Sequence, residues 1–185
     1  MPPVSSVLAR EVWEIEGVGA LRVRVATRED LATIDGTWPA LRQPTDWHHA
    51  WRWDDICASK RERFAVIAND EPVGIWCCDH TTPRDLPNRI AYRLDYLEVR
   101  GDLRSGPIGP FLLTVIASRA LEVGADSVIL AAFPIPGLVR AYVASGAEER
   151  CAKGWNPPPK LIPLVYEHAA LAHLQGLADD LVKQP

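Results

Sequence analysis

Several features are missing from this 185-residue sequence, and each absence excludes a class of protein. No apolar run approaches about eighteen residues, the length that a helix needs to cross a membrane. Residues 1–17 lack a basic segment followed by an apolar stretch, so no secretory signal is predicted. No cluster of five or more basic residues occurs, and the net charge of −4 argues against a nucleic-acid partner. We therefore expect a cytoplasmic protein that binds neither membranes nor nucleic acid.

The spacing that metal sites require is also missing. The sequence has four cysteines, which are Cys57, Cys77, Cys78 and Cys151, and none forms a C-x-x-C pair. Neighbouring Cys77 and Cys78 would point to opposite faces of a strand, which disfavours a disulfide between them, so reduced and partly buried thiols are expected. His48, His49 and His80 do not stand at ligand spacing from cysteines or carboxylates. We predict no metal site.

What the sequence does contain suits one folded domain. Hydrophobic residues make up 48% of the chain, which is enough to build a core at this length. No repeat, linker or low-complexity segment divides the sequence. We therefore predict a single domain over residues 1–185.

The first part of the chain predicts two hairpins separated by helices. Residues 11–25 alternate in two runs around a glycine-containing turn, which is typical of a hairpin. Thr27 and Asp30 have the spacing of a capping box and predict a helix that ends at Pro39. Residues 64–80 form two apolar runs around the turn residues 69–72, which predicts the second hairpin.

A second helix is predicted within residues 44–63, and Asp46 is a candidate for its N-cap. Trp47, Trp51 and Ile56 fall roughly on one face of this helix. Large aromatic side chains at helical spacing are more often core than ligand-binding, so core packing is the favoured interpretation. The alternative is that exposed aromatics there shape a substrate pocket.

The stretch that organises the rest of the chain runs from Arg89 to Gly124. Residues 89–100 interleave β-forming and charged residues and predict a strand, and residues 108–123 predict an apolar helix that Gly124 ends. The turn between them is rich in glycine. Strand, turn and helix together are typical of a phosphate-binding loop, where backbone N–H groups converge at a helix N-terminus. A tight turn that only packs the helix on the sheet is the alternative for this stretch alone.

The last part of the chain alternates strands and helices. Residues 127–133 are a short apolar run that predicts a buried strand, reached from the preceding strand by a right-handed crossover. Residues 138–149 predict a helix that closes on Gly146, and two strands are predicted within residues 147–153 and 160–168. A final helix is predicted over residues 168–183.

The hexapeptide from Arg104 to Gly109 resembles the R/Q-x-x-G-x-G/A signature of the GCN5-related N-acetyltransferases (GNAT), which binds the pyrophosphate of acetyl-CoA. Pro107 replaces the first signature glycine and has no N–H to donate. Tyr142 and Gly146 similarly match the family's Y-x-k-x-G-F motif, in which alanine here replaces the phenylalanine.

The order of predicted elements resembles the family's fold over about residues 21–167. The resemblance implies an α/β fold with a central mixed sheet flanked by helices, here with an extra N-terminal strand and a C-terminal helix. It implies an N-acetyltransferase that transfers an acetyl group from acetyl-CoA to a primary amine of a small molecule or protein. The alternative is a degenerate member that keeps the fold and acts as a binding or regulatory partner. A homodimer is left open.

The resemblance also assigns residues to roles. Tyr142 matches the family's tyrosine acid near the CoA sulfur, with plain packing as the alternative. The family's carboxylate base falls here near Arg93, which cannot act as a base, so Asp95 on the same strand face is the nearest substitute. Glu98 lies on the opposite face and is expected to be solvated or paired. The residues assigned to acetyl-CoA are Leu97, Val99, Arg104, Ser105, Gly106, Ile108 and Gly109.

Overall fold

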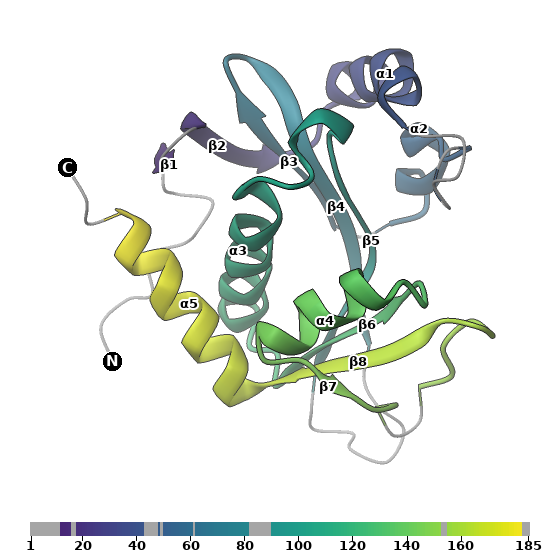
Figure 1. The fold of residues 1–185 in the computed structure, drawn as a ribbon, viewed down its shortest axis with the longest axis vertical. Helices are drawn as coiled ribbons and strands as arrows, with labels where there is room; N and C mark the ends of the chain where they lie inside the picture. The colour runs from purple at the N-terminus through teal and green to yellow at the C-terminus, as the bar shows by residue number, and fades with distance from the viewer. Residues whose placement is uncertain are drawn as a thin grey trace. The chain divides into compact units, whose positions relative to one another are not determined.

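The computed structural model describes residues 12–15, 18–42, 48, 50–60, 62–81, 90–152 and 155–182 (Figure 1). Asp46, Trp47, His49 and residues 82–89 lie outside the described residues. The strands are β1 (Trp13–Ile15), β2 (Gly19–Val25), β3 (Glu62–Ala68), β4 (Glu71–Thr81), β5 (Ala91–Val99), β6 (Ser127–Ala132), β7 (Glu148–Glu149) and β8 (Ile162–Glu167). The helices are α1 (Arg28–Thr37), α2 (Trp53–Cys57), α3 (Ile108–Glu122), α4 (Pro136–Ala144) and α5 (His168–Val182), with short 3₁₀ turns η2 (Trp38–Leu41) and η3 (Gly101–Leu103).

The strands follow the order β1-β2-β3-β4-β5-β6-β8-β7. β5 and β6 pair in parallel, whereas β1–β2, β2–β3, β3–β4, β6–β8 and β7–β8 pair antiparallel. The predicted mixed sheet with flanking helices, an added N-terminal strand and a C-terminal helix is confirmed. The parallel β5–β6 pair with α3 between them is the predicted crossover.

The chain forms two compact units, and each is described by itself. The first unit contains the described residues up to Cys78 and the segment Tyr96–Leu112, and the second contains Asp79–Asp95 and Leu113–Asp180. β5 and α3 each contribute a segment to both units. The prediction of one domain over residues 1–185 stays a prediction.

In the first unit, α1 and α2 pack on one face of the β3–β4 hairpin. The buried residues of this core are Ala26, Leu31, Ile34, Trp38, Trp53, Cys57, Ala65, Ile67, Ile75 and Cys77. The predicted capping box at the start of α1 is confirmed, because the Thr27 side chain accepts from the Asp30 amide and Asp30 accepts from the Thr27 amide. Burial opposes ionisation of Asp30, but hydrogen bonds from Arg24 and Thr27 outweigh it and lower the pKa of that carboxyl.

The predicted helix within residues 44–63 is much shorter than expected. Among the described residues it covers only Trp53–Cys57, and Trp51 lies before it in irregular chain. The Asp35 carboxylate accepts hydrogen bonds from the amides of Trp53 at 2.6 Å and Asp54 at 3.0 Å, so a side chain from α1 caps this helix. Trp51 and Ile56, two of the residues predicted to share one face, are half-buried and pack against this core, so core packing is confirmed for these two.

The β3–β4 hairpin closes with a tight turn at Asn69 and Asp70. Both residues adopt positive φ, at 49° and 63°. Two adjacent left-handed residues of these types are typical of a type I′ turn, whose twist matches that of the paired strands. The predicted hairpin is confirmed, and its turn is tighter than the residues 69–72 proposed from sequence.

In the second unit, β6 lies between β5 and β8, and Ala91, Ile129 and Val165 form a buried cluster across these three strands. Gly124 ends α3 as predicted, with φ of 74°, and the Ala125 amide donates to the Ala120 carbonyl at 2.9 Å. The strand predicted at residues 147–153 is wrong in extent, because β7 covers only Glu148–Glu149.

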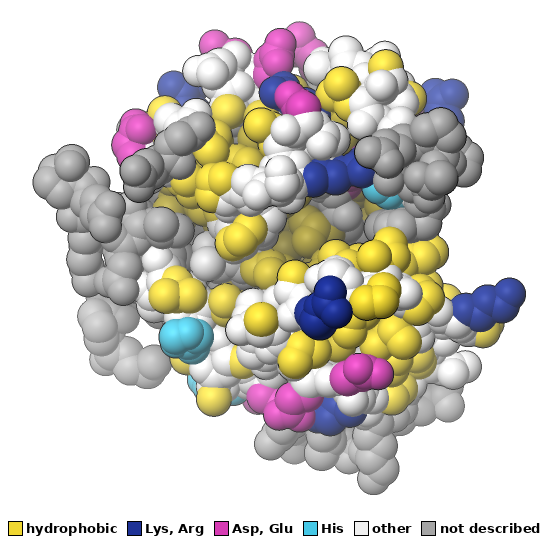
Figure 2. All heavy atoms as spheres, in the orientation of Figure 1, with side chains coloured by type: hydrophobic (Ala, Val, Ile, Leu, Met, Phe, Trp, Pro, Cys, Tyr) yellow, Lys and Arg dark blue, Asp and Glu magenta, His cyan; other side chains and the backbone are white. Residues whose placement is uncertain are grey.

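Hydrophobic side chains gather over α4 on the face shown in Figure 2. Ile135, just before α4, is 44% exposed and Val143 is 45% exposed. Apolar side chains grouped on a surface often mark contact with another molecule.

None of the described helices combines the length and apolar character needed to cross a membrane.

Candidate functional site

The turn that carries the signature residues begins with a very close backbone contact. A Cβ added to Gly101 would lie 2.3 Å from the Leu41 carbonyl oxygen, a separation that real Cβ atoms do not show. Only glycine therefore lets η3 approach η2 this closely. The Arg100 amide, just before Gly101, donates to the Val73 carbonyl at 3.0 Å and ties the end of β5 to β4.

The start of α3 offers two backbone donors. The Phe111 amide donates to the Pro107 carbonyl at 3.0 Å, so Pro107 is the N-cap and Ile108 is the first helical residue. The first four N–H positions of an α-helix have no intrahelical acceptor, and here they fall on residues 107–110. Pro107 and Pro110 have no N–H, which leaves the amides of Ile108 and Gly109. Pro107 lies within the signature hexapeptide, whereas Pro110 follows it and was not predicted from sequence to affect the site.

The two signature glycines differ in what surrounds them. The Gly106 amide donates to the Leu103 carbonyl at 3.1 Å, so this N–H is already used within the turn. A Cβ added to Gly109 would meet nothing within 4 Å, so open space adjoins the helix N-terminus there. Ser105 is exposed in the same turn. Gly109, which is half-buried, therefore forms the accessible part of the predicted phosphate site, whereas Ile108 is fully buried.

Arg104 points toward the interior of the first unit. Its Nη2 lies 2.6 Å from Nε2 of His48 and 3.8 Å from Oε1 of Glu98, and its side chain is 31% exposed. The resemblance assigns Arg104 to the pyrophosphate. In the structure its contacts include these two residues.

Glu98 is the centre of a buried polar cluster that the sequence analysis did not describe. Arg42 donates to both Glu98 oxygens, and Trp53 Nε1 donates to Oε2 at 2.7 Å. His48 Nε2 lies 3.2 Å from Oε1. Burial opposes ionisation of Glu98, but its polar contacts with His48, Arg42 and Trp53 outweigh it and lower its pKa. Glu98 was expected to be either solvated or paired, and the structure confirms that it is paired.

The alternation of side chains between the two faces of β5 contains a sequence signal for this cluster. Glu98 shares a strand face with Tyr96, and that face packs against Trp51, whose ring centroid is 4.8 Å from that of Tyr96. A carboxylate on a face that also carries an aromatic residue must be hydrogen-bonded if it is buried. Its cationic partner, Arg42, lies 56 residues earlier and no local pattern identifies it.

Asp95 lies beside Arg93 on the strand face predicted for it. Arg93 Nε donates to Asp95 Oδ1 at 2.6 Å, and Nη2 of the same guanidinium reaches Asp79 at 3.2 Å. The hydrogen bond that Arg93 donates to Asp95 outweighs burial and raises the pKa of Arg93. Because Arg93 donates to both Asp95 oxygens, Asp95 must separate from Arg93 before it can contact a substrate amine.

Tyr142 is buried in α4, with 8% of its surface exposed. Its carbonyl oxygen accepts hydrogen bonds from Ser145 Oγ at 2.8 Å and from the Tyr166 hydroxyl at 3.3 Å. Burial raises the pKa of the Tyr142 phenol well above its usual value, and burial also raises that of Tyr166, to about 12. The Tyr142 phenol is therefore protonated at neutral pH, the state required of a proton donor.

Leu97 and Val99 lie on the face of β5 opposite Glu98, and both are half-buried.

Among the described residues, no three His, Cys, Asp or Glu side chains lie close enough together to hold a metal ion. Cys57, Cys77 and Cys78 are buried free thiols, and Cys151 is an exposed one.

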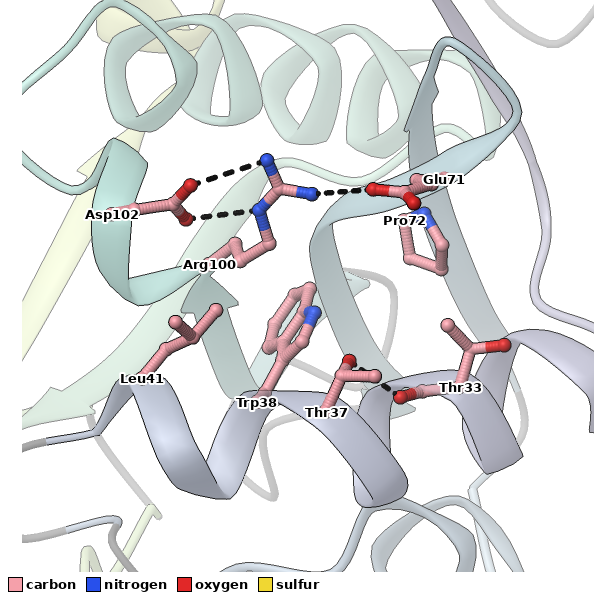
Figure 3. A pocket seen from close by; sticks show the side chains of 8 residues that line it. All are labelled: Thr33, Thr37, Trp38, Leu41, Glu71, Pro72, Arg100 and Asp102. Carbon is pink, nitrogen blue, oxygen red and sulfur yellow. Dashed lines mark hydrogen bonds and ion pairs between the residues drawn. The ribbon is translucent and has the colours of Figure 1, made fainter.

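A pocket of about 190 Å³ lies elsewhere in the first unit (Figure 3). Arg100 spans its upper part, with Asp102 on one side at 2.9 Å and Glu71 on the other at 3.0 Å. Trp38 and Leu41 face Arg100 from below. Two carboxylates neutralise Arg100, and none of the lining residues belongs to the signature turn at residues 104–109. We therefore assign no part of the predicted chemistry to this pocket.

Solved structures identify the fold. The GNAT domain of S. lividans PAT superposes with a TM-score of 0.64 at 13% identity, over 84% of this chain and 95% of that one. The chain has the GNAT fold. No protein-family model matches it, and no curated protein matches it in sequence.

Two further structures with the GNAT fold were solved with CoA or a CoA analogue. The PaiA N-acetyltransferase from Thermoplasma acidophilum, in complex with coenzyme A, has a TM-score of 0.59 and 11% identity, with coverage of 80% of this chain and 98% of that one. Arabidopsis thaliana Naa50, in complex with the bisubstrate analogue CoA-Ac-MVNAL, has a TM-score of 0.53 and 16% identity, with coverage of 78% and 96%.

Proposed function

We propose that this chain is an acetyl-CoA-dependent N-acetyltransferase that binds the CoA pyrophosphate at the N-terminus of α3. The observation that carries the proposal is the Gly109 amide at the start of α3, which adjoins open space and lies next to the amide of the buried Ile108. The macrodipole of a 15-residue helix adds about half a positive charge at this point. A phosphate group therefore meets both directed donors and a favourable field.

The residues at the N-terminus of α3 suit the CoA pyrophosphate, although they provide fewer N–H donors than a glycine-rich helix start would. Ile108 and Gly109 would hold the pyrophosphate, Arg104 and Ser105 would flank it, and Gly106 would keep the turn compact. Leu97 and Val99 are proposed to line the cofactor along β5. Each charge-assisted hydrogen bond contributes about 1.5–3 kcal/mol, so the two prolines reduce affinity without removing the site.

Acetyl-CoA would supply the acetyl group as a reactive thioester. The acceptor nitrogen forms a bond to the carbonyl carbon while the carbon–sulfur bond breaks. Tyr142 is proposed to protonate the departing thiolate, because its phenol holds its proton at neutral pH. Asp95 is proposed to remove the proton from the attacking amine once it separates from Arg93.

The acceptor is proposed to be a primary amine of a small molecule or a protein. Naa50 was solved with an analogue that joins CoA to a peptide, which supports a peptide amine as one class to test. Tests of transfer should therefore compare peptides that carry a free N-terminus with small primary amines. Appearance of free thiol that depends on one class would assign the acceptor.

A second function is favoured by a specific observation. Two of the four N–H positions at the start of α3 are prolines, which is the change expected if phosphate binding had been lost. The chain would then keep the fold as a binding or regulatory partner. Its exposed apolar side chains over α4, Ile135 and Val143, would suit such contacts, including a homodimer.

Calorimetric titration with CoA distinguishes the two functions. A Gly109→Asp substitution places a negative charge beside the proposed phosphate position without an internal clash. We expect affinity to fall at least tenfold, which corresponds to about 1.4 kcal/mol. Gly36→Asp is the matched control, because Gly36 is exposed in α1 and a Cβ there also meets nothing within 4 Å.

Three outcomes would be informative. Loss of affinity in Gly109→Asp with normal affinity in Gly36→Asp supports the acetyltransferase. Equal affinity of all three folded proteins would remove the α3 N-terminus from the proposal. A parent chain that binds no CoA at millimolar concentration would favour the binding partner.

A further inference from the structure

One nitrogen atom, Nε2 of His48, lies in contact with two groups of opposite hydrogen-bonding character. Arg104 Nη2 lies 2.6 Å from it and Glu98 Oε1 lies 3.2 Å from it. A guanidinium can only donate, and a carboxylate can only accept. An imidazole nitrogen accepts when it lacks a proton and donates when it carries one, so Nε2 can serve only one of these partners at a time.

The short Arg104 contact indicates which arrangement the structure holds. Two N–H groups at 2.6 Å would repel each other, so His48 Nε2 accepts from Arg104 and the ring proton resides on Nδ1. In the alternative arrangement, Nε2 carries the proton and donates to Glu98. That arrangement requires Arg104 to move away.

Glu98 is a fixed partner for either arrangement. Arg42 donates to both of its oxygens at 2.9 Å, and the Glu98 side chain is only 3% exposed. Trp53 donates to Oε2, which leaves Oε1 as the oxygen that faces His48. The carboxylate therefore stays in place while His48 and Arg104 change.

Arg104 is also the cation of the signature turn, three residues before Pro107, whose carbonyl receives the first helical hydrogen bond of α3. A pyrophosphate at Ile108 and Gly109 carries negative charge next to this turn. It would therefore compete with His48 and Glu98 for the guanidinium.

We propose that His48 and Glu98 are positioning residues that hold Arg104 until CoA binds. When phosphate draws Arg104 away, the His48 tautomer changes so that Nε2 carries the ring proton and donates to Glu98. The free and bound states are thus distinguished by the His48 tautomer, with no net proton gained or lost. This inference rests on the proposed binding of CoA beside Arg104.

His48 also connects this exchange to an aromatic cluster. Its ring centroid lies 5.6 Å from that of Trp51, which in turn packs on Trp53 and Tyr96. A change of hydrogen-bond partner at His48 reorients a ring that contacts Trp51. Cofactor binding is thereby coupled to the packing of half-buried aromatics in the first unit.

Nitrogen-15 NMR of the histidine rings tests the tautomer directly. The His48 signals are assigned by their loss in His48→Gln, and the spectrum is recorded with and without CoA at constant pH. We expect Nε2 to change from an unprotonated to a protonated nitrogen on CoA binding, with the reverse change at Nδ1. In Arg104→Gln, Nε2 should be protonated already in the free protein. A merely structural role of Arg104 would produce neither change.

A double-mutant cycle gives an independent measurement. His48→Ala removes the group that competes for Arg104, so CoA affinity should rise at least about threefold, a coupling typical of residues in direct contact. The same substitution in an Arg104→Gln chain should leave CoA affinity unchanged. His48→Gln, which keeps a hydrogen-bonding side chain, serves if the alanine variant does not fold.

The outcomes separate this inference from the proposed function. CoA binding with an unmoved His48 tautomer, or equal effects of His48→Ala in both backgrounds, would overturn the inference and leave the proposed function standing. Absence of CoA binding by the parent chain would overturn both.

Discussion

Arg42 and Glu98 form a buried ion pair with two parallel hydrogen bonds. Arg42 Nε donates to Oε1 at 2.9 Å and Nη2 donates to Oε2 at 2.9 Å, and the two side chains are 1% and 3% exposed. The pair joins Arg42, the C-cap of η2, to Glu98, the penultimate residue of β5. It therefore fixes the strand end from which the signature turn starts.

Glu98→Gln should destabilise the first unit strongly. Removal of one charge from a buried pair leaves the other uncompensated, which costs about 3–5 kcal/mol. Urea denaturation measures the loss. Asp102→Asn is the matched control, because it breaks an ion pair whose carboxylate side chain is 48% exposed and should cost at most about 1 kcal/mol.

The same carboxylate predicts a pH dependence. Its folded-state pKa lies below the ordinary value of 4.5, so ionised Glu98 stabilises the fold at higher pH. This contribution is lost as the pH falls from about 4.5 through the folded-state pKa. Denaturation midpoints of the parent should decline in this acidic range, and those of Glu98→Gln should decline less. Parallel profiles for the two proteins would contradict the pairing described here.

Gly101→Ala should destabilise the signature turn, because the new methyl group would overlap the Leu41 carbonyl. Overpacking of this kind costs about 1–3 kcal/mol. Gly36→Ala is the control, since its methyl group meets no neighbour and alanine favours helix. Thermal unfolding compares the two variants, and equal midpoints would show that η3 can move away from η2 without cost.

Pro107→Gly should raise CoA affinity. The substitution restores an N–H at the N-cap of α3, which is worth about 1.5–3 kcal/mol less roughly 0.5–1 kcal/mol for the more flexible turn. Calorimetry should therefore show a gain of about tenfold. If the parent binds no CoA at millimolar concentration and the variant does, the binding-partner function replaces the enzyme.

Tyr142→Phe should slow acetyl transfer at least about a hundredfold and leave CoA affinity unchanged, because only the proton donor is lost. The Tyr142 carbonyl, which accepts from Ser145 and Tyr166, is unaffected by the substitution. Ser145→Ala removes one of those bonds while it keeps the phenol and is the control. A Tyr142→Phe variant as fast as the parent on its acceptor would assign Tyr142 to packing.

The sequence predicted the elements whose signals are local. The capping box at Thr27 and Asp30, the turn at Asn69 and the helix stop at Gly124 each depend on residues a few positions apart. The parallel β5–β6 pair followed from strand, helix and strand in order. These local patterns predict the structure reliably because the backbone conformation at each position requires those residue types.

The polar cluster could not be predicted in the same way. Glu98 meets Arg42 and Trp53 across 56 and 45 residues, and the direction of Arg104 depends on both that cluster and His48. The short extent of α2 likewise depends on a cap from Asp35, 18 residues before Trp53. These contacts arise from tertiary packing, which no spacing within a segment encodes.

The central claim is that CoA phosphates bind the amides at the start of α3, and an amide NMR titration with CoA tests it most directly. The account predicts saturable shifts that are largest at Ile108 and Gly109, and smaller at Gly106, whose amide already donates to Leu103. Saturable shifts confined to the pocket around Thr33 and Arg100, or no shifts at millimolar CoA, would contradict the claim.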